Sequence, residues 1–99
     1  MDKKECFQEF RDGKRNLFFL VTRDCTDEIL QQHMFYRRID DRTISTIGFI
    51  SEEDAGNFLG AVIKDRDNWK IIHIDVLAFD AFLDSLDGDF RGNLLFEMM

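Results

Sequence analysis

The stretch SEEDAGNFLGAV, residues 51–62, decides the fold class. Ser51 is a typical first residue of a helix cap, because its hydroxyl accepts a hydrogen bond from the first turn. Three carboxylates follow at the positive end of the helix dipole, where they are favourable: Glu52, Glu53 and Asp54. The next apolar residues lie on one stripe: Ala55, Phe58, Leu59 and Val62. The pattern predicts an amphipathic helix near residues 52–63 that packs on a sheet.

A strand and a second helix follow. Residues 69–75 alternate between two faces, as a strand does. Asp75 can cap a helix near residues 76–86. The core face of that helix carries Phe79, Phe82, Leu83 and Leu86. Gly88 has the position of a left-handed helix terminator.

The first half of the chain adds a helix and a strand. Residues 2–11 place Cys6, Phe7 and Phe10 at helical spacing. The continuous apolar run LFFLV, residues 17–21, is typical of a central strand that is covered on both faces.

A hairpin and a last strand complete the pattern. Residues 33–39 and 42–50 form the two arms of the hairpin, around a turn at Asp40 and Asp41. The run LLF at residues 94–96 is typical of a final strand. Residues 26–34 fit either a short helix or a strand, and the pattern does not decide between them.

The order of these elements predicts an α+β fold in one domain, residues 1–99. We expect a single sheet of about four to five strands with two amphipathic helices packed on it. The predicted core consists of Phe18, Leu20, Phe58, Leu59, Val62, Ile72, Ile74, Phe79, Phe82 and Leu83.

The net negative charge of the chain lies in its second half. Residues 1–50 hold nine basic and nine acidic residues, whereas residues 51–99 hold four basic and eleven acidic ones. The second half therefore carries the whole formal net charge of −7. Such an asymmetry repels nucleic acid and anionic membranes and attracts a basic partner.

Part of this acidic charge forms a stripe. Asp80, Asp84 and Asp87 lie at i, i+4 and i+7 of the predicted second helix, with no cation between them, and Asp89 extends the row. Like charges at this spacing oppose the helix by about 0.2–0.5 kcal/mol per pair. The stripe is either a solubilising face or an interface with a cationic surface. The partner-binding candidates are Asp80, Asp84, Asp87 and Asp89, followed by Glu52, Glu53 and Asp54.

The sequence contains no motif that indicates catalysis or a cofactor. Cys6, Cys25, His33 and His73 do not have the spacing of zinc ligands. The aspartates near residues 84–89 lack the order of a calcium loop. We therefore expect a protein that is not an enzyme and binds no metal, with reduced cysteines, no membrane span and a cytoplasmic location.

One stretch resembles a known family. The segment IGFISEEDA at residues 47–55, then Phe58, the strand at residues 71–75 and a Leu- and Phe-rich helix are similar to SseB-like (enhanced serine sensitivity) domains. The resemblance covers about residues 47–86 and carries over no functional residue. It implies a small sheet-based domain of a kind that often lacks catalytic residues and is also found among bacterial toxin-immunity proteins.

Together these observations favour a protein-binding inhibitor. We expect a cytoplasmic immunity protein that occludes the active site of a basic toxin domain, such as a nuclease, without direct contact to nucleic acid. The alternatives are a phage-type inhibitor that mimics nucleic acid and a small ligand-sensing domain.

Overall fold

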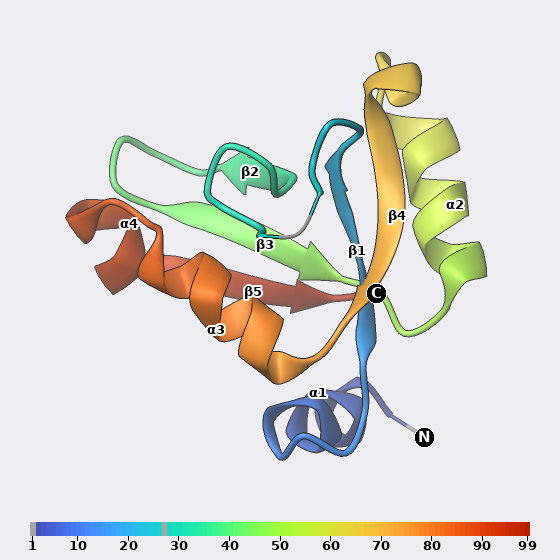
Figure 1. The fold of residues 1–99 in the computed structure, drawn as a ribbon, viewed down its shortest axis with the longest axis horizontal. Coiled ribbons are helices and arrows are strands. Elements are labelled where there is room, and N and C mark those ends of the chain that lie inside the picture. Colours follow the sequence, from blue (N-terminus) through green and yellow to red (C-terminus); the bar gives the residue numbers. More distant parts are fainter. Residues whose placement is uncertain (1, 27) are drawn as a thin grey trace.

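The computed structural model describes residues 2–26 and 28–99 of the chain (Figure 1). The elements run in this order: α1 (Lys3–Arg11), β1 (Leu17–Thr22), β2 (Tyr36–Arg38), β3 (Ile44–Gly48), α2 (Glu52–Val62), the 3-10 turn η1 (Arg66–Asn68), β4 (Trp69–Ile74), α3 (Val76–Asp84), α4 (Gly88–Gly92) and β5 (Leu94–Met98). The α+β class predicted from the sequence is confirmed.

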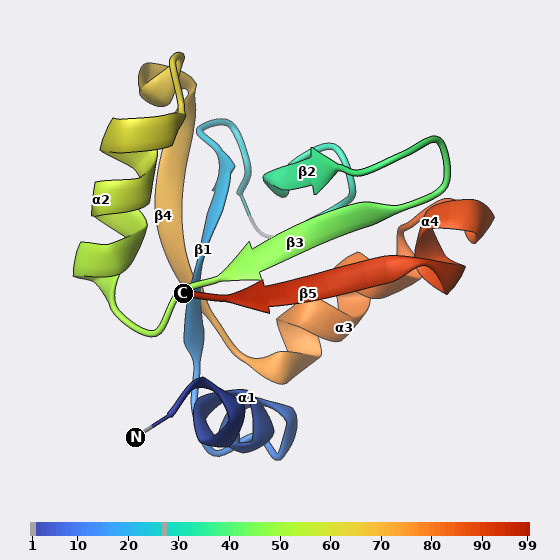
Figure 2. The same cartoon turned by 180° about the vertical axis from the view of Figure 1, so that it is seen from behind.

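The strands form two small sheets, so the prediction of a single sheet is wrong. β1 pairs antiparallel with β4, while β2, β3 and β5 form a second sheet in which β3 and β5 run parallel. The sheets touch at isolated bridges, one between Phe18 and Phe49 and one between Val21 and Met34. Figures 1 and 2 show β3 and β5 running toward β1 at a steep angle and ending beside it, which prevents a continuous ladder between the sheets.

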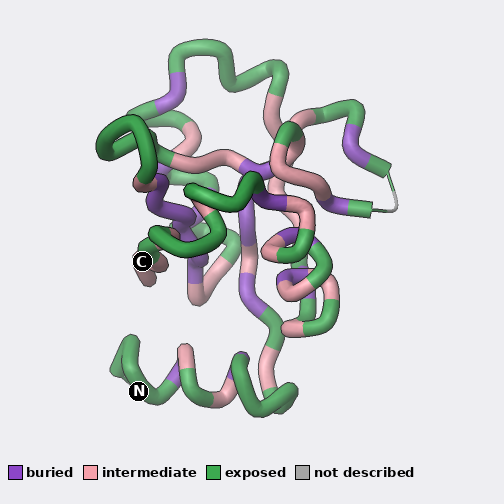
Figure 3. Tube along the Cα trace, turned by 90° about the vertical axis from the view of Figure 1, so that its left-hand side faces the viewer, coloured by how far each residue is buried: buried purple, intermediate pink, exposed green. Residues whose placement is uncertain are grey.

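β1 lies at the centre of the molecule, as its apolar run predicts. Leu17, Phe19 and Val21 belong to one core cluster with residues of α1 and α3. Leu20 belongs to a second cluster, which α2 covers. Because consecutive residues of a strand point to opposite faces, both faces of β1 need apolar side chains. Figure 3 shows buried residues gathered along the central strands.

The predicted core is largely confirmed. Five of its members are buried: Leu20, Phe58, Ile74, Phe79 and Phe82. Four are half-buried: Phe18, Leu59, Ile72 and Leu83. The prediction for Val62 is wrong, since its exposed fraction is 53%. The helix ends there, and the extended cap residue Ile63 takes the core position, with 8% exposed.

The second helix is shorter than expected. α3 ends at Asp84, and the hydroxyl of the cap residue Ser85 donates to the Phe82 carbonyl at 2.6 Å. The same hydroxyl accepts from the Gln31 amide at 2.9 Å, so a distant loop fixes this end. Gly88 begins α4 and is not a left-handed terminator. Among the described residues only Gly13 has a positive φ, of 75°.

The sequence pattern leaves open whether residues 26–34 form a helix or a strand. Residues 26 and 28–33 belong to neither helix nor strand, and Met34 forms only its single bridge. Asp27 lies outside the described residues. The hairpin that follows is confirmed, with Tyr36 opposite Thr46 and Arg38 opposite Ile44.

Candidate protein-interaction site

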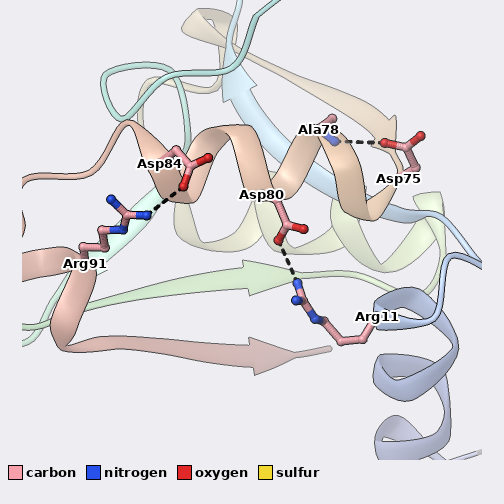
Figure 4. Close-up of polar contacts among 6 residues, drawn as sticks. All are labelled: Arg11, Asp75, Ala78, Asp80, Asp84 and Arg91. Atoms are coloured by element: carbon pink, nitrogen blue, oxygen red, sulfur yellow. Dashed lines mark hydrogen bonds and ion pairs between the residues drawn. The ribbon is translucent and has the colours of Figure 1, made fainter.

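α3 places the first two residues of the predicted acidic stripe. The Asp75 carboxylate accepts a hydrogen bond from the Ala78 amide at 2.9 Å, which begins the helix where the sequence predicts. Phe79 and Phe82 hold its inner face in the core. Asp80 and Asp84 are therefore presented on the outside, one turn apart (Figure 4).

Both aspartates have cationic partners, contrary to the expectation of a stripe without cations. The Arg11 guanidinium lies 2.9 Å from the Asp80 carboxylate, and Arg91 lies 2.8 Å from Asp84 (Figure 4). Arg11 comes from the last turn of α1 and Arg91 from α4. Neither pair is visible in the sequence pattern, because each joins two separate elements.

These ion pairs are exposed. The side chains of Asp84 and Arg91 are 71% and 59% exposed, and those of Asp80 and Arg11 are 45% and 39% exposed. Pairs of this kind contribute about 0–1 kcal/mol to stability. A competing cation from another protein can replace either arginine at low cost.

The other two aspartates of the stripe lie on a different helix. Asp87 precedes α4 and Asp89 lies in its first turn, so they do not continue the row along α3. The Gln31 side chain anchors this corner, because its oxygen accepts from the Asp87 amide at 3.0 Å. Among the described residues neither carboxylate forms an ion pair, and both residues are exposed.

A surface hollow of about 570 Å³ lies between the acidic residues of α3 and the start of β5. Its lining consists of Asp80, Leu83, Asp84, Arg91 and Leu94. Two carboxylates thus stand beside two half-buried leucines. A long cationic side chain fits such a lining, since its methylene stem packs on apolar surface while its charged head meets carboxylates.

The other acidic residues predicted for partner binding lie in the first turn of α2. Glu52, Glu53 and Asp54 are exposed in the first turn of α2, where the Ser51 hydroxyl accepts from the Asp54 amide at 3.1 Å as predicted. α2 covers the face of β1 and β4 opposite to α3, as the two core clusters and Figure 1 show. The structure therefore separates the two acidic groups predicted for partner binding.

The cysteines and histidines lie apart. Cys6 and Cys25 are both buried in the core, and the Cys25 thiol donates to the Glu28 carbonyl at 3.8 Å. The His33 ring accepts from the Leu30 amide at 3.1 Å, and the exposed His73 ring stacks on Phe18 at 4.2 Å between centroids. In residues 2–26 and 28–99, no three His, Cys, Asp or Glu side chains are grouped so that they could hold a metal ion.

No helix within the described part of the chain is long and apolar enough to cross a bilayer. Comparison with protein-family models and with curated proteins finds no match for this chain.

Proposed function

We propose that this protein is an inhibitor that binds a basic partner protein through the surface formed by α3 and α4. The observation that carries the proposal is the hollow with Asp80 and Asp84 at its rim and Leu83 and Leu94 in its lining. Asp87 and Asp89, whose carboxylates form no ion pair among the described residues, add negative charge at the start of α4. An arginine or lysine of the partner would enter the hollow and exchange with Arg91.

The partner would be a toxin domain with a cationic substrate site, such as a nuclease. Burial of its lysines and arginines against carboxylates would block access of the anionic substrate. In this proposal the protein acts in the cytoplasm as an immunity protein, in line with the resemblance to SseB-like domains. The negative second half would also speed the encounter with a basic partner through long-range attraction.

The α3–α4 surface is preferred over the acidic turn of α2 for a physical reason. Glu52, Glu53 and Asp54 lie in the first turn of a helix, where the dipole already stabilises them. None of them lines the hollow beside Asp80 and Asp84. They supply negative potential at a distance from that hollow.

The ligand-sensing alternative has less support. Its best candidate is a hollow of about 260 Å³ lined by Lys3, Lys4, Phe7, Phe96 and Met98. Ligand sites commonly measure about 300–1,000 Å³. The volume of this hollow lies below that range, and two of its five lining residues are lysines.

The test is protection of cells against a toxin. Cells would produce a basic nuclease toxin domain that the purified unchanged chain binds, together with either the unchanged chain or the double variant Asp80→Lys with Asp84→Lys. We expect the unchanged chain to protect and the double variant to fail at equal protein levels. The control is Glu52→Lys with Glu53→Lys, which makes the same charge change on the opposite side and should still protect. Equal protection by both variants would refute the proposed surface.

A further inference from the structure

The outer edge of β4 has backbone groups without partners. β4 is the second strand of a two-stranded sheet, so only its β1 side is paired. α2 packs on the face of this sheet, where Leu20 and Ile71 lie in its core cluster. The edge itself is bonded to no strand of the described residues.

The hydrogen bonds of β1 show which β4 residues point outward. Phe18 exchanges both backbone hydrogen bonds with Phe49, at 2.9 and 2.8 Å, so it turns away from β4. The Leu20 carbonyl likewise accepts from Phe35, on the side away from β4. Residues of a strand alternate in this direction, so Leu17, Phe19 and Val21 are the ones that bond to β4. Their partners are Ile74, Ile72 and Lys70.

The other β4 residues therefore direct their backbone groups outward. Trp69 is already satisfied, because its amide donates to Arg66 and its carbonyl lies 3.5 Å from the Arg23 guanidinium. Ile71 and His73 remain, and no hydrogen bond of the described residues reaches their amides or carbonyls. Ile71 and His73 are therefore the two described residues whose backbone groups are free at this edge, and we call them the free window of β4.

Nothing in the sequence of β4 protects this window. Proteins commonly blunt a free edge with proline, a bulge or an outward lysine. The chain has no proline. The single lysine of the strand, Lys70, donates its ammonium to the Cys25 carbonyl and so points back into the molecule.

We infer that the β4 edge pairs with the β4 edge of a second copy of this chain. An antiparallel pair centred on Ile72 sets Ile71 opposite His73 of the second copy, and His73 opposite its Ile71. Every free amide and carbonyl of both windows then has a partner. A pair centred on Ile71 instead would need the Trp69 groups, which are already bonded. The pattern of free groups therefore selects one register.

The side chains fit this register. The two Ile72 residues face each other as a β-branched pair, which is favourable across strands. Lys70 faces Ile74 of the second copy, so no like charges meet within the strands. The net charge of −7 per chain opposes association at long range, so we expect the dimer to strengthen as salt rises. Salt should have the opposite effect on the proposed partner binding at α3 and α4.

The test is the mass of the unchanged protein in solution by sedimentation, over a wide range of concentration and at low and high salt. We expect a shift from one copy of 11.7 kDa to two copies that is more complete at high salt. His73→Pro removes an outward amide that the single copy does not use, together with the ring that stacks on Phe18. It should abolish the dimer, and a circular dichroism spectrum like that of the unchanged protein would show that the variant is folded.

A thiol at the centre tests the register. Ile72→Cys should form a disulfide between copies, because facing residues of this kind lie about 4.5 Å apart. His73→Cys is the control, since the two introduced thiols would lie beyond the ~7 Å that a disulfide spans. A single copy at every concentration and salt level would overturn the inference, as would dimerisation that His73→Pro leaves intact in a folded protein. A cross-link with His73→Cys but none with Ile72→Cys would overturn the register.

Discussion

Gly48 and the Phe96 ring lie so close that a side chain on Gly48 has no room. A Cβ atom at Gly48 would lie 2.8 Å from Cζ of Phe96. The ring is held on two sides, because it packs edge-on against Phe79 at 5.3 Å and in a tilted arrangement against Phe7 at 4.9 Å between centroids. Gly48 thus lets β5 and the phenylalanine cluster close over β3.

Gly48→Ala should therefore lower the free energy of unfolding by about 1–3 kcal/mol, as overpacking of a core does. Chemical denaturation measures this directly. Adding Phe96→Leu should recover part of the loss, because it removes the atom that clashes. A Gly48→Ala protein as stable as the unchanged one would show that the ring has free space.

The glycines of α2 should respond in the opposite way. Gly56 and Gly60 are exposed, and a Cβ at either position meets nothing within 4 Å. Each substitution by alanine should raise the free energy of unfolding by up to about 1 kcal/mol, because alanine favours the helix. Thermal denaturation of the two single variants measures the effect. Destabilisation would mean that a partner surface or the sheet approaches this side of α2.

Phe82 should be among the most sensitive positions of the core. Its side chain is 0% exposed and it packs in the cluster with Phe79. Phe82→Ala should cost about 3–5 kcal/mol, which can unfold a domain of this size. Leu77→Ala is the matched control, because Leu77 lies on the same helix and is 74% exposed. Equal denaturation midpoints for the two variants would contradict the position of α3.

The hairpin turn should give the protein a specific dependence on pH. The Asp40 carboxylate accepts from the backbone amides of Arg42 and Thr43, at 2.9 and 2.8 Å. The pKa of Asp40 lies below its ordinary 3.8. The main cause is the hydrogen bond from the Arg42 amide, and the second is the hydrogen bond from the Thr43 side chain. The resulting stabilisation is present above about pH 3.8 and is lost as the pH falls through the lower folded pKa.

Asp40→Asn should remove this contribution, because it keeps an acceptor oxygen but cannot ionise. The stability gap between the two proteins should be widest near neutral pH and vanish in acid. Denaturation at a series of pH values measures the gap, with Asp41→Asn as the control for loss of a neighbouring charge. Titration of Asp40 at or above pH 3.8 in the folded protein would refute this account of the turn.

The individual helices and strands were predictable because the residues that determine each one are close together in the sequence. Ser51 and Asp75 cap helices within three residues of themselves, and the spacing of Phe79 and Phe82 reports one face of one helix. The continuous apolar run of β1 correctly indicated a strand covered on both faces.

The arrangement of the elements was not predictable in this way. The split into two sheets depends on the crossing angle of β3 over β1, which no spacing reports. The partners of the acidic stripe were missed for a related reason. Arg11 is 69 residues from Asp80, and Arg91 reaches Asp84 from a separate short helix, α4. Replacing Asp80 or Asp84 therefore removes an attraction to an arginine as well as the repulsion between the two carboxylates.

The most direct test of the central proposal is a titration with an arginine-rich peptide, followed by amide chemical shifts at two salt concentrations. We predict that shifts gather on α3 and α4, that Asp80→Asn with Asp84→Asn weakens binding severalfold, and that salt above about 0.15 M weakens it further. Glu52→Gln with Glu53→Gln removes the same charge from α2 and should leave the affinity nearly unchanged. Equal losses in both double variants would contradict the proposal, since they would mean that the peptide responds to net charge and not to the hollow beside Asp80 and Asp84.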